Sequence, residues 1–375
     1  MTDQEYMLRA IQLAKKGEGW TNPNPMVGAV IVKDGKIIGE GYHKKYGELH
    51  AERNAIASLT ESAEGAVIYV TLEPCCHHGK TPPCTEAIIE QKIRKVVIGS
   101  RDPNPKVAGK GVQMLREAGV TVVEDFMREE CDQLNPVFFH YITTKTPYVV
   151  MKYAMTLDGK IATKTGASKW ITGEAARKEV QHMRHQYMGI MAGIGTVLAD
   201  DPMLNVRVEG WKSPVRIVCD SKLRITPDSQ IVKSAGKYRT IVAYADWKNT
   251  EEKIKILHTM GVETIYCPDE KNQIDLKKLM TDLGNRGIDS ILLEGGGTLN
   301  DSALRAGIVK EVQAFVAPKL FGGVAGKTPV EGIGVEFPSE AVELKYTDIC
   351  QIGEDIRIRC QVCEKKQEES CLQES

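Results

Sequence analysis

The sequence predicts an α/β protein with two domains. Its 375 residues are more than one domain usually holds. Short apolar runs with strand character alternate with helical patterns in both halves of the chain, which is typical of a layered α/β fold. A polar passage at 141–148 separates the halves. We therefore expect domains at 1–145 and 146–363, followed by a charged, disordered tail at 364–375.

The N-terminal half alternates regularly between the two patterns. Apolar side chains at helical spacing predict helices at 3–18, 50–59, 84–89 and 111–118. Runs rich in Val and Ile predict strands at 27–32, 36–41, 67–72, 95–99 and 120–123. Asp34-Gly35 is expected to form the hairpin turn between the first two strands.

The C-terminal half has longer intervals between its elements. We expect strands at 148–155, 188–193, 215–219, 240–244, 264–267, 290–294 and 356–362. A helix is expected at 174–187, capped by Thr172. Glycine-rich turns at 193–196 and 294–298 each follow a strand, where backbone N–H groups can approach a phosphate. Each alone is better explained as a tight turn, but two in one domain make a nucleotide site an equal alternative.

Composition excludes several classes of protein. The net charge is −1, with 49 basic and 50 acidic residues, which argues against a broad nucleic-acid surface. The polar N-terminus is not a secretory signal, and no apolar run is long enough to span a membrane. Ten cysteines are too few for a disulfide scaffold. We expect a cytoplasmic protein whose partners are neither nucleic acids nor membranes.

Three residues predict a zinc site. His50, Cys75 and Cys84 supply an imidazole and two thiolates, which leaves one tetrahedral position open, as in catalytic zinc sites. His-x-Glu followed by Pro-Cys and a second Cys is typical of zinc nucleobase deaminases. Here the two cysteines are separated by eight residues rather than two, so the neighbouring side chains compete as ligands; these are Cys76, His77 and His78. We favour Cys75 because it follows Pro74, and Cys84 because it opens a helix.

Glu52 is the expected proton carrier of this site, because it lies two residues from the proposed ligand His50. The chemistry expected is the replacement of an exocyclic ring amine by water. Asn24, His43 and Lys80 are candidate substrate contacts. A turn-forming role for Asn24 and a solvated position for His43 and Lys80 are equal alternatives.

The motifs together resemble one enzyme family. Thr21-x-Pro23-Asn24-Pro25, His50-Ala51-Glu52 and the run from Glu73 to Cys84 look like the bifunctional riboflavin-biosynthesis deaminase/reductase. The resemblance continues past residue 145. It implies an N-terminal cytidine-deaminase-like three-layer domain and a C-terminal dihydrofolate-reductase-like α/β domain. The first would deaminate a diamino-ribosylamino-pyrimidinone phosphate with zinc held by His50, Cys75 and Cys84, and the second would reduce its ribosyl group with NADPH.

The resemblance also assigns residues in the second half. NADPH would contact Ala154, Trp170, Thr196, Asp200, Ser221 and the turn Gly296, Gly297, Thr298, Leu299, Asn300, Asp301, Ser302. The substrate would contact Ser168, Arg184, Leu204, Arg207 and Glu294, with Lys152 as a catalytic candidate beside it. Simpler alternatives are core packing for Ala154, Leu204 and Trp170, and a solvated helix face for Arg184.

Other hypotheses remain open from the residues alone. One is a zinc nucleobase deaminase, for example of tRNA, with a nucleotide-binding C-terminal module. Another is a structural zinc joined to a nucleotide sensor, although such a site has no use for Glu52. Cys360-x-x-Cys363 has no nearby partner pair and is not expected to bind metal. The family resemblance leads us to expect a homo-oligomer.

Overall fold

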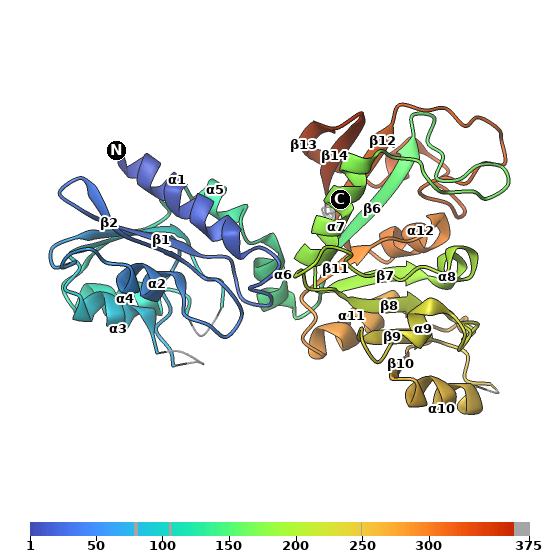
Figure 1. Cartoon of the computed structure of the whole chain (residues 1–375), viewed down its shortest axis with the longest axis horizontal. Coiled ribbons are helices and arrows are strands. Elements are labelled where there is room, and N and C mark those ends of the chain that lie inside the picture. The colour runs from blue at the N-terminus through green and yellow to red at the C-terminus, as the bar shows by residue number, and fades with distance from the viewer. Residues whose placement is uncertain (79–81, 105–106, 249, 364–375) are drawn as a thin grey trace, which may run out of the picture.

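The chain forms two separate β-sheets, each in its own lobe (Figure 1). The computed structural model describes residues 1–78, 82–104, 107–248 and 250–363. Lys80 and the expected tail at 364–375 lie outside these residues. One sheet has five strands in the order β2-β1-β3-β4-β5, and the other has nine in the order β10-β9-β8-β7-β11-β6-β12-β14-β13.

The N-terminal lobe has three layers. Its strands are β1 (Gly28–Lys33), β2 (Lys36–Tyr42), β3 (Val67–Leu72), β4 (Lys95–Ser100) and β5 (Thr121–Val123). Its helices are α1 (Asp3–Ala14), α2 (Ala51–Ala57), α3 (Cys84–Glu90), α4 (Lys110–Glu117) and α5 (Arg128–Asp132). One buried cluster joins α2, α3 and α4 to the sheet, and another joins α1 and α5 to it. The helices therefore cover both faces.

The expected N-terminal elements are confirmed, with boundaries that shift by a few residues. The first helix ends at Ala14 and continues as a short 3₁₀ turn, Lys15–Gly17. Thr2 and Glu5 form a reciprocal capping box at its start, with Glu5 N donating to Thr2 Oγ1 at 3.3 Å. The second expected helix begins at Ala51, so that His50 is its N-cap residue.

The C-terminal lobe is a mostly parallel sheet. Its strands are β6 (Tyr148–Thr156), β7 (Gly189–Gly193), β8 (Val215–Cys219), β9 (Thr240–Tyr244), β10 (Val262–Tyr266), β11 (Ser290–Leu293), β12 (Val309–Ala317), β13 (Leu344–Ile352) and β14 (Asp355–Val362). Only the hairpin of β13 and β14 is antiparallel to its neighbours. The sequence pattern did not predict β12 or β13.

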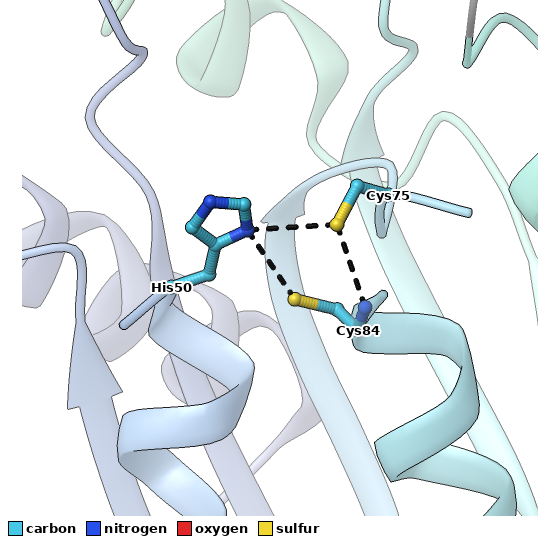
Figure 2. Close-up of side chains that lie close together, drawn as sticks. All are labelled: His50, Cys75 and Cys84. Atoms are coloured by element: carbon cyan, nitrogen blue, oxygen red, sulfur yellow. Dashed lines mark hydrogen bonds between the residues drawn. The ribbon is translucent and has the colours of Figure 1, made fainter. Parts of the chain in front are cut away.

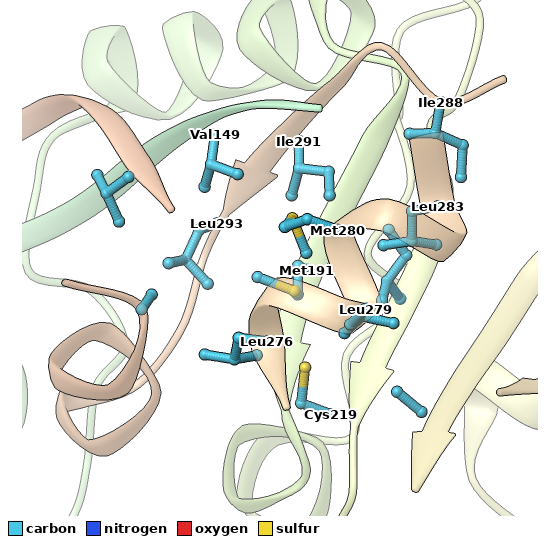
Figure 3. Packing of buried hydrophobic residues seen from close by; sticks show 14 of the residues in the cluster. Val149, Met191, Cys219, Leu276, Leu279, Met280, Leu283, Ile288, Ile291 and Leu293 are labelled. Carbon is cyan, nitrogen blue, oxygen red and sulfur yellow. The ribbon is translucent and has the colours of Figure 1, made fainter. Parts of the chain in front are cut away.

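Helices cover this sheet on both faces. They are α7 (Glu174–Gln186), α8 (Ile194–Asp200), α9 (Gln230–Lys233), α10 (Glu251–Thr259), α11 (Leu276–Asn285) and α12 (Gly297–Arg305). Leu279, Met280 and Leu283 of α11 pack on Met191 and Ile291 of the sheet (Figure 3). A separate cluster joins α8, α9 and α10 to the sheet.

One capping prediction is wrong. The N-cap of α7 is Gly173, not Thr172. The Gly173 N–H donates to Asp355 Oδ2 at 2.8 Å, and the Thr172 carbonyl oxygen accepts from Arg177 Nη1 at 2.7 Å. The start of α7 is therefore fixed by the β13–β14 hairpin rather than by a hydroxyl in its own sequence.

The two lobes touch through the segment that follows α1. Asn22 Nδ2 donates to Asp289 Oδ2 at 2.9 Å, and Glu18 pairs with His182 at 3.1 Å. The Trp20 ring lies 4.8 Å from that of His185. The helix α6 (Pro136–Thr144) joins the lobes in the chain (Figure 1), and Tyr141 donates from it to the Gly284 carbonyl oxygen. The expected polar passage therefore begins within a helix. No helix in the described part of the chain is long and apolar enough to cross a membrane.

Gly41 lets α2 lie directly on the N-terminal sheet. A Cβ atom at this position would lie 2.2 Å from Ala55 N and 2.5 Å from Ala51 O, both in α2. We expect Gly41→Ala to lower the free energy of unfolding of this lobe by about 1–3 kcal/mol, because the helix must move outwards. Urea unfolding measures this effect. Gly236→Ala, where a Cβ would meet nothing within 4 Å, is the control. Equal midpoints for the two variants would contradict the prediction.

Candidate active sites

The chain turns of the N-terminal lobe bring His50, Cys75 and Cys84 together (Figure 2). His50 precedes α2, Cys75 follows β3, and Cys84 is the first residue of α3. His50 Nδ1 lies 3.5 Å from Cys75 Sγ and 3.4 Å from Cys84 Sγ. The three ligand atoms lie within 4.8 Å of one another, so one ion could contact all of them.

The cluster of His50, Cys75 and Cys84 favours the thiolate form of Cys75. A hydrogen bond from Cys84 and a second one from His50 hold the pKa of the Cys75 thiol well below its usual value, at about 4, against the effect of burial. The Cys84 backbone N–H also points at Cys75 Sγ, at 3.4 Å. The hydrogen bond with Cys75 in turn raises the pKa of His50. A soft donor set of two thiols and an imidazole fits zinc.

The competing ligands lie outside this cluster. The group that could hold a metal does not include Cys76, His77 or His78. His78 Nε2 instead lies 3.4 Å from Glu86 Oε1, and His77 lines the adjoining cavity. This arrangement supports the choice of Cys75 and Cys84 as ligands.

A cavity of about 250 Å³ opens beside the cluster. Glu52 lies in its wall and is only 3% exposed, and burial raises the pKa of this carboxyl to about 6. A carboxyl with this pKa can both take up and release a proton near neutral pH. Asn24 and His43 also line the cavity, whereas Lys80 lies outside the described residues.

His43 is held in one tautomer. Its Nδ1 lies 3.1 Å from the Leu49 carbonyl oxygen, which can only accept, so Nδ1 carries the proton. Its Nε2 is then an acceptor for Asn24 Nδ2, at 3.3 Å. Burial lowers the pKa of His43, which favours this neutral form. The pair presents a fixed polar edge to the cavity.

Sequence reasoning missed several polar residues of this cavity, among them Asp102 and Asn104. Asp102 and Asn104 line it from the loop after β4. Burial raises the pKa of Asp102 to about 6, although the Asn104 N–H donates to it. Their position at the carboxyl end of a parallel strand was a usable signal, because ligands bind at such ends.

The C-terminal lobe has a larger cavity of about 600 Å³ at the carboxyl ends of β7, β8 and β11. Most of the residues expected to contact a dinucleotide line it: Thr196, Asp200, Ser221, Gly296, Gly297, Thr298, Leu299 and Ser302. Ser168, an expected substrate contact, lines it too. A Cβ at Gly195 would meet nothing within 4 Å, and one at Gly296 would lie 3.8 Å from Thr196 Oγ1. The two glycine turns thus lie close together at this cavity, and the open space beside Gly195 fits the approach of a dinucleotide.

Four expected cofactor residues do not line this cavity. Ala154 packs against the buried cluster around Tyr148 and Val150. Trp170 is 61% exposed, with the Arg177 guanidinium 4.6 Å from its ring. Asn300 is buried and donates to the Pro329 carbonyl oxygen, and Asp301 pairs with Arg305.

A charged group lies beside the cavity. Arg184 donates to Glu294 through two nitrogens, at 2.8 and 2.9 Å. Burial opposes ionisation of Glu294, yet Arg184, Lys152 and Arg207 hold the pKa of this carboxyl at about 2. Burial lowers the pKa of Lys152. These four expected residues therefore act on one another, whereas Leu204 is a buried core residue.

Two family models match the chain. One describes the cytidine and deoxycytidylate deaminase zinc-binding region and matches residues 1–100. The other describes the RibD C-terminal domain and matches residues 147–358, more than half of the chain.

Named relatives match nearly the whole chain. The riboflavin biosynthesis protein RibD of Actinobacillus pleuropneumoniae is 58% identical over 95% of this chain and 94% of its own length. The RibD protein of Escherichia coli is 42% identical over 95% and 98%. Among solved structures, RibD of Acinetobacter baumannii has a TM-score of 0.86 with 38% identity, covering 96% of this chain and 99% of that one. A deaminase/reductase from Thermotoga maritima has a TM-score of 0.85 with 39% identity over 96% and 98%.

Neighbouring thiols allow a direct test of the metal ligands. We expect Cys84→Ser to retain on the order of 0.1 zinc per chain or less, because it removes one of the three proposed protein ligands. Cys76→Ser is the matched control, since Cys76 lies beside a ligand but outside the cluster, and it should retain zinc. Elemental analysis after gel filtration gives the stoichiometry. If the Cys76 variant alone lost zinc, Cys76 rather than Cys84 would be the ligand.

Proposed function

The chain belongs to the RibD family of bifunctional deaminase/reductases of riboflavin biosynthesis, and on that premise we propose which of its residues perform each reaction. The protein is a zinc-dependent deaminase and an NADPH-dependent reductase that acts on a small phosphorylated substrate. We assign the deaminase to residues 1–145 and the reductase to 146–363. The observation that carries the assignment is a buried glutamate, Glu52, in the cavity beside the His50, Cys75 and Cys84 cluster.

His50, Cys75 and Cys84 would hold the zinc ion. When bound there, zinc lowers the pKa of a water molecule and makes it nucleophilic at neutral pH. Glu52 would take one proton from the water and pass it to a pyrimidine ring nitrogen, and would then take the second proton from the newly added hydroxyl and give it to the amine, which leaves as ammonia. Its raised pKa suits both steps. Asn24 and His43 orient the ring from the cavity wall, and Lys80 is a further proposed contact.

The reductase reaction would take place where the charged group meets the NADPH cavity. Glu294 fixes the Arg184 guanidinium in one orientation through its two hydrogen bonds, so Arg184 is a positioned rather than a mobile cation. Lys152, whose pKa is lowered by burial, is proposed to orient or protonate the sugar of the substrate. Ser168 and Arg207 bind the substrate, and Leu204 supplies a packing contact. Ala154, Trp170, Asn300 and Asp301 remain proposed cofactor contacts that require a rearranged cavity.

The two reactions are proposed to occur in sequence, with the deamination of 2,5-diamino-6-ribosylamino-4(3H)-pyrimidinone 5′-phosphate first. Reduction then gives 5-amino-6-ribitylamino-uracil 5′-phosphate. A single-activity deaminase with a nucleotide-binding module is the alternative. We place the enzyme in the cytoplasm, because its free thiols, the proposed zinc ligands Cys75 and Cys84 among them, and its use of NADPH suit a reducing compartment.

The variant Glu52→Gln distinguishes an enzyme with two sequential activities from a deaminase with a nucleotide-binding module. We expect it to slow deamination by about 10²–10⁴-fold while zinc content is unchanged, since the amide cannot carry a proton. NADPH oxidation, followed from the diamino substrate, should fall equally. Oxidation from the already deaminated intermediate should not change.

The matched control is Glu48→Gln, because Glu48 is another carboxylate that lines the same cavity but is exposed. It should leave both rates near those of the unmodified protein. If no NADPH is oxidised even from the deaminated intermediate, the C-terminal half is a binding module and the chain is a deaminase only. If Glu52→Gln deaminates normally, the proton role is wrong.

We also propose that two copies associate through the β13 edge of the nine-stranded sheet. Among the described residues, β13 pairs with β14 and with no strand on its other side. An unprotected edge strand can pair with another chain. Its side chains Tyr346 and Ile349 are 68% and 59% exposed. The preceding segment exposes further apolar side chains, including Val324, Ile333 and Phe337. Such a concentration is typical of an interface.

A charge at this edge should disrupt the assembly. We expect Ile349→Lys to shift the mass measured by light scattering after gel filtration from oligomer to monomer, because a lysine would be buried in the interface. Trp247→Lys, at an apolar residue that is 63% exposed on another part of the lobe, is the control and should leave the mass unchanged. A monomeric unmodified protein would contradict the proposal.

A further inference from the structure

A buried glutamine on β12 has an oxygen atom without a hydrogen-bond partner. Gln313 is 5% exposed, and its Oε1 finds no partner among the described residues. Its Nε2 donates to Glu311 Oε1 at 2.7 Å. Because a carboxylate can only accept, the amide nitrogen must face Glu311 and the amide cannot be turned round. The free oxygen of Gln313 is therefore an acceptor with a fixed orientation.

Glu311 is in turn held by the next strand. Arg359 of β14 donates to its Oε1 through Nε at 2.7 Å and to its Oε2 through Nη2 at 2.8 Å. Such a bidentate pair fixes the plane of the carboxylate. Tyr148 Oη donates to Oε2 as well, at 3.4 Å. Since Glu311 is held at both oxygens, the Gln313 amide that donates to it has little freedom to move.

Lys152 lies opposite Gln313 on the neighbouring strand. β12 pairs in parallel with β6 (Figure 1), and the register places Gln313 beside Lys152. Paired residues of parallel strands project from the same face of the sheet, with the strands about 4.8 Å apart. The Lys152 Nζ atom lies 5.7 Å from the centre of the Phe315 ring, two positions from Gln313 on that face of β12. The two side chains therefore reach the same space.

The Lys152 ammonium has charged neighbours but no acceptor. Glu294 attracts it and Arg184 repels it, while within the described residues Nζ makes no hydrogen bond. Both oxygens of Glu294 already accept from Arg184. A buried donor and a buried acceptor without partners each cost free energy. Lys152 and Gln313 can each supply the hydrogen-bond partner that the other lacks.

We propose that Gln313 is a positioning residue of the reductase, whose Oε1 accepts a hydrogen bond from the Lys152 ammonium in the reacting complex. The proposal deepens the reductase function above and rests on it. The flexible side chain of lysine lets Nζ turn from Phe315 to the fixed oxygen without movement of the strands. The bond points the ammonium in one direction and favours its charged form, which is the form that can give a proton to the sugar.

The other groups around Lys152 leave this role open. Glu294 is paired with Arg184, and Glu311 with Arg359. Burial raises the pKa of the two phenols on this face, so both stay neutral. The titratable and charged groups that face Lys152 are Tyr148, Arg184, Tyr187, Glu294, Glu311 and Arg359. Removing the Gln313 oxygen leaves all of these groups in place.

The test is the pH dependence of NADPH oxidation by the full-length, zinc-loaded protein, started from the already deaminated intermediate. Gln313→Met keeps the length of the side chain without its oxygen, so the charged form of Lys152 loses an acceptor. We expect the alkaline limb of the kcat profile to move to lower pH by about one unit, and KM to change less than about twofold. Gln313→Glu keeps an oxygen and should leave the limb in place or move it to higher pH.

Two controls separate positioning from packing. Gln351→Met makes the same exchange on β13, where the exposed amide donates to the Gly353 carbonyl oxygen, and should leave the profile unchanged. Adding Gln313→Met to Lys152→Met should not change the residual rate further, because Gln313 acts through the ammonium. Melting temperatures of all variants report the effect on stability.

Several results would overturn the assignment. A lower melting temperature with an unmoved limb would give Gln313 a packing role only. A higher KM with an unmoved limb would make Gln313 a substrate contact. Should Gln313→Met fail to fold, a limb that moves to lower pH in Gln313→Glu would contradict the proposal. An unmodified protein that oxidises no NADPH from this intermediate would overturn the reductase function itself, and the role of Gln313 with it.

Discussion

The parallel pairing of neighbouring strands is the constraint on which both active sites depend. β3 pairs in parallel with β4, and β7 pairs in parallel with both β8 and β11. Parallel strands end at the same edge of a sheet, so the loops that leave them meet there. Cys75 and Asp102 are thus brought to one cavity from two consecutive strands of the chain. The glycine turns after β7 and β11 are brought to the other cavity in the same way.

Close packing then places the proposed metal ligands on this edge. His50 and Cys84 stand at the starts of α2 and α3, and α2 approaches the sheet backbone at Gly41 because no side chain separates them. A helix held at that distance has little freedom to slide. The positions of the His50 imidazole and the Cys84 thiol therefore follow from the packing of helices on the sheet. The position of the Cys75 thiol depends on the single loop after β3.

Much of the fold and of the first site could be predicted from the sequence, because both rest on local patterns. Strands such as β3 and β8 are buried on both faces, so they appear as continuous apolar runs with clear ends. The strand β13 was missed because it lies at the sheet edge and its side chains alternate without a buried face. Thr172 seemed the natural cap of α7, but Asp355 fixes that helix from nearly two hundred residues away. Asp102 was missed although the end of β4 was predicted, because the sequence does not show which other loops meet that strand end in one cavity.

The contact between the lobes has a consequence for how such a two-activity chain could be divided. Asp289 is buried, and its Oδ2 accepts from Asn22 across the boundary, while Trp20 covers His185. Cutting the chain within 145–147 would leave a carboxylate and aromatic faces uncovered on separate pieces. Two independent enzymes made from these halves would each expose a group that the intact chain covers, the Trp20 ring on one and the Asp289 carboxylate on the other. The two halves are therefore joined by contacts between their surfaces as well as by the peptide chain.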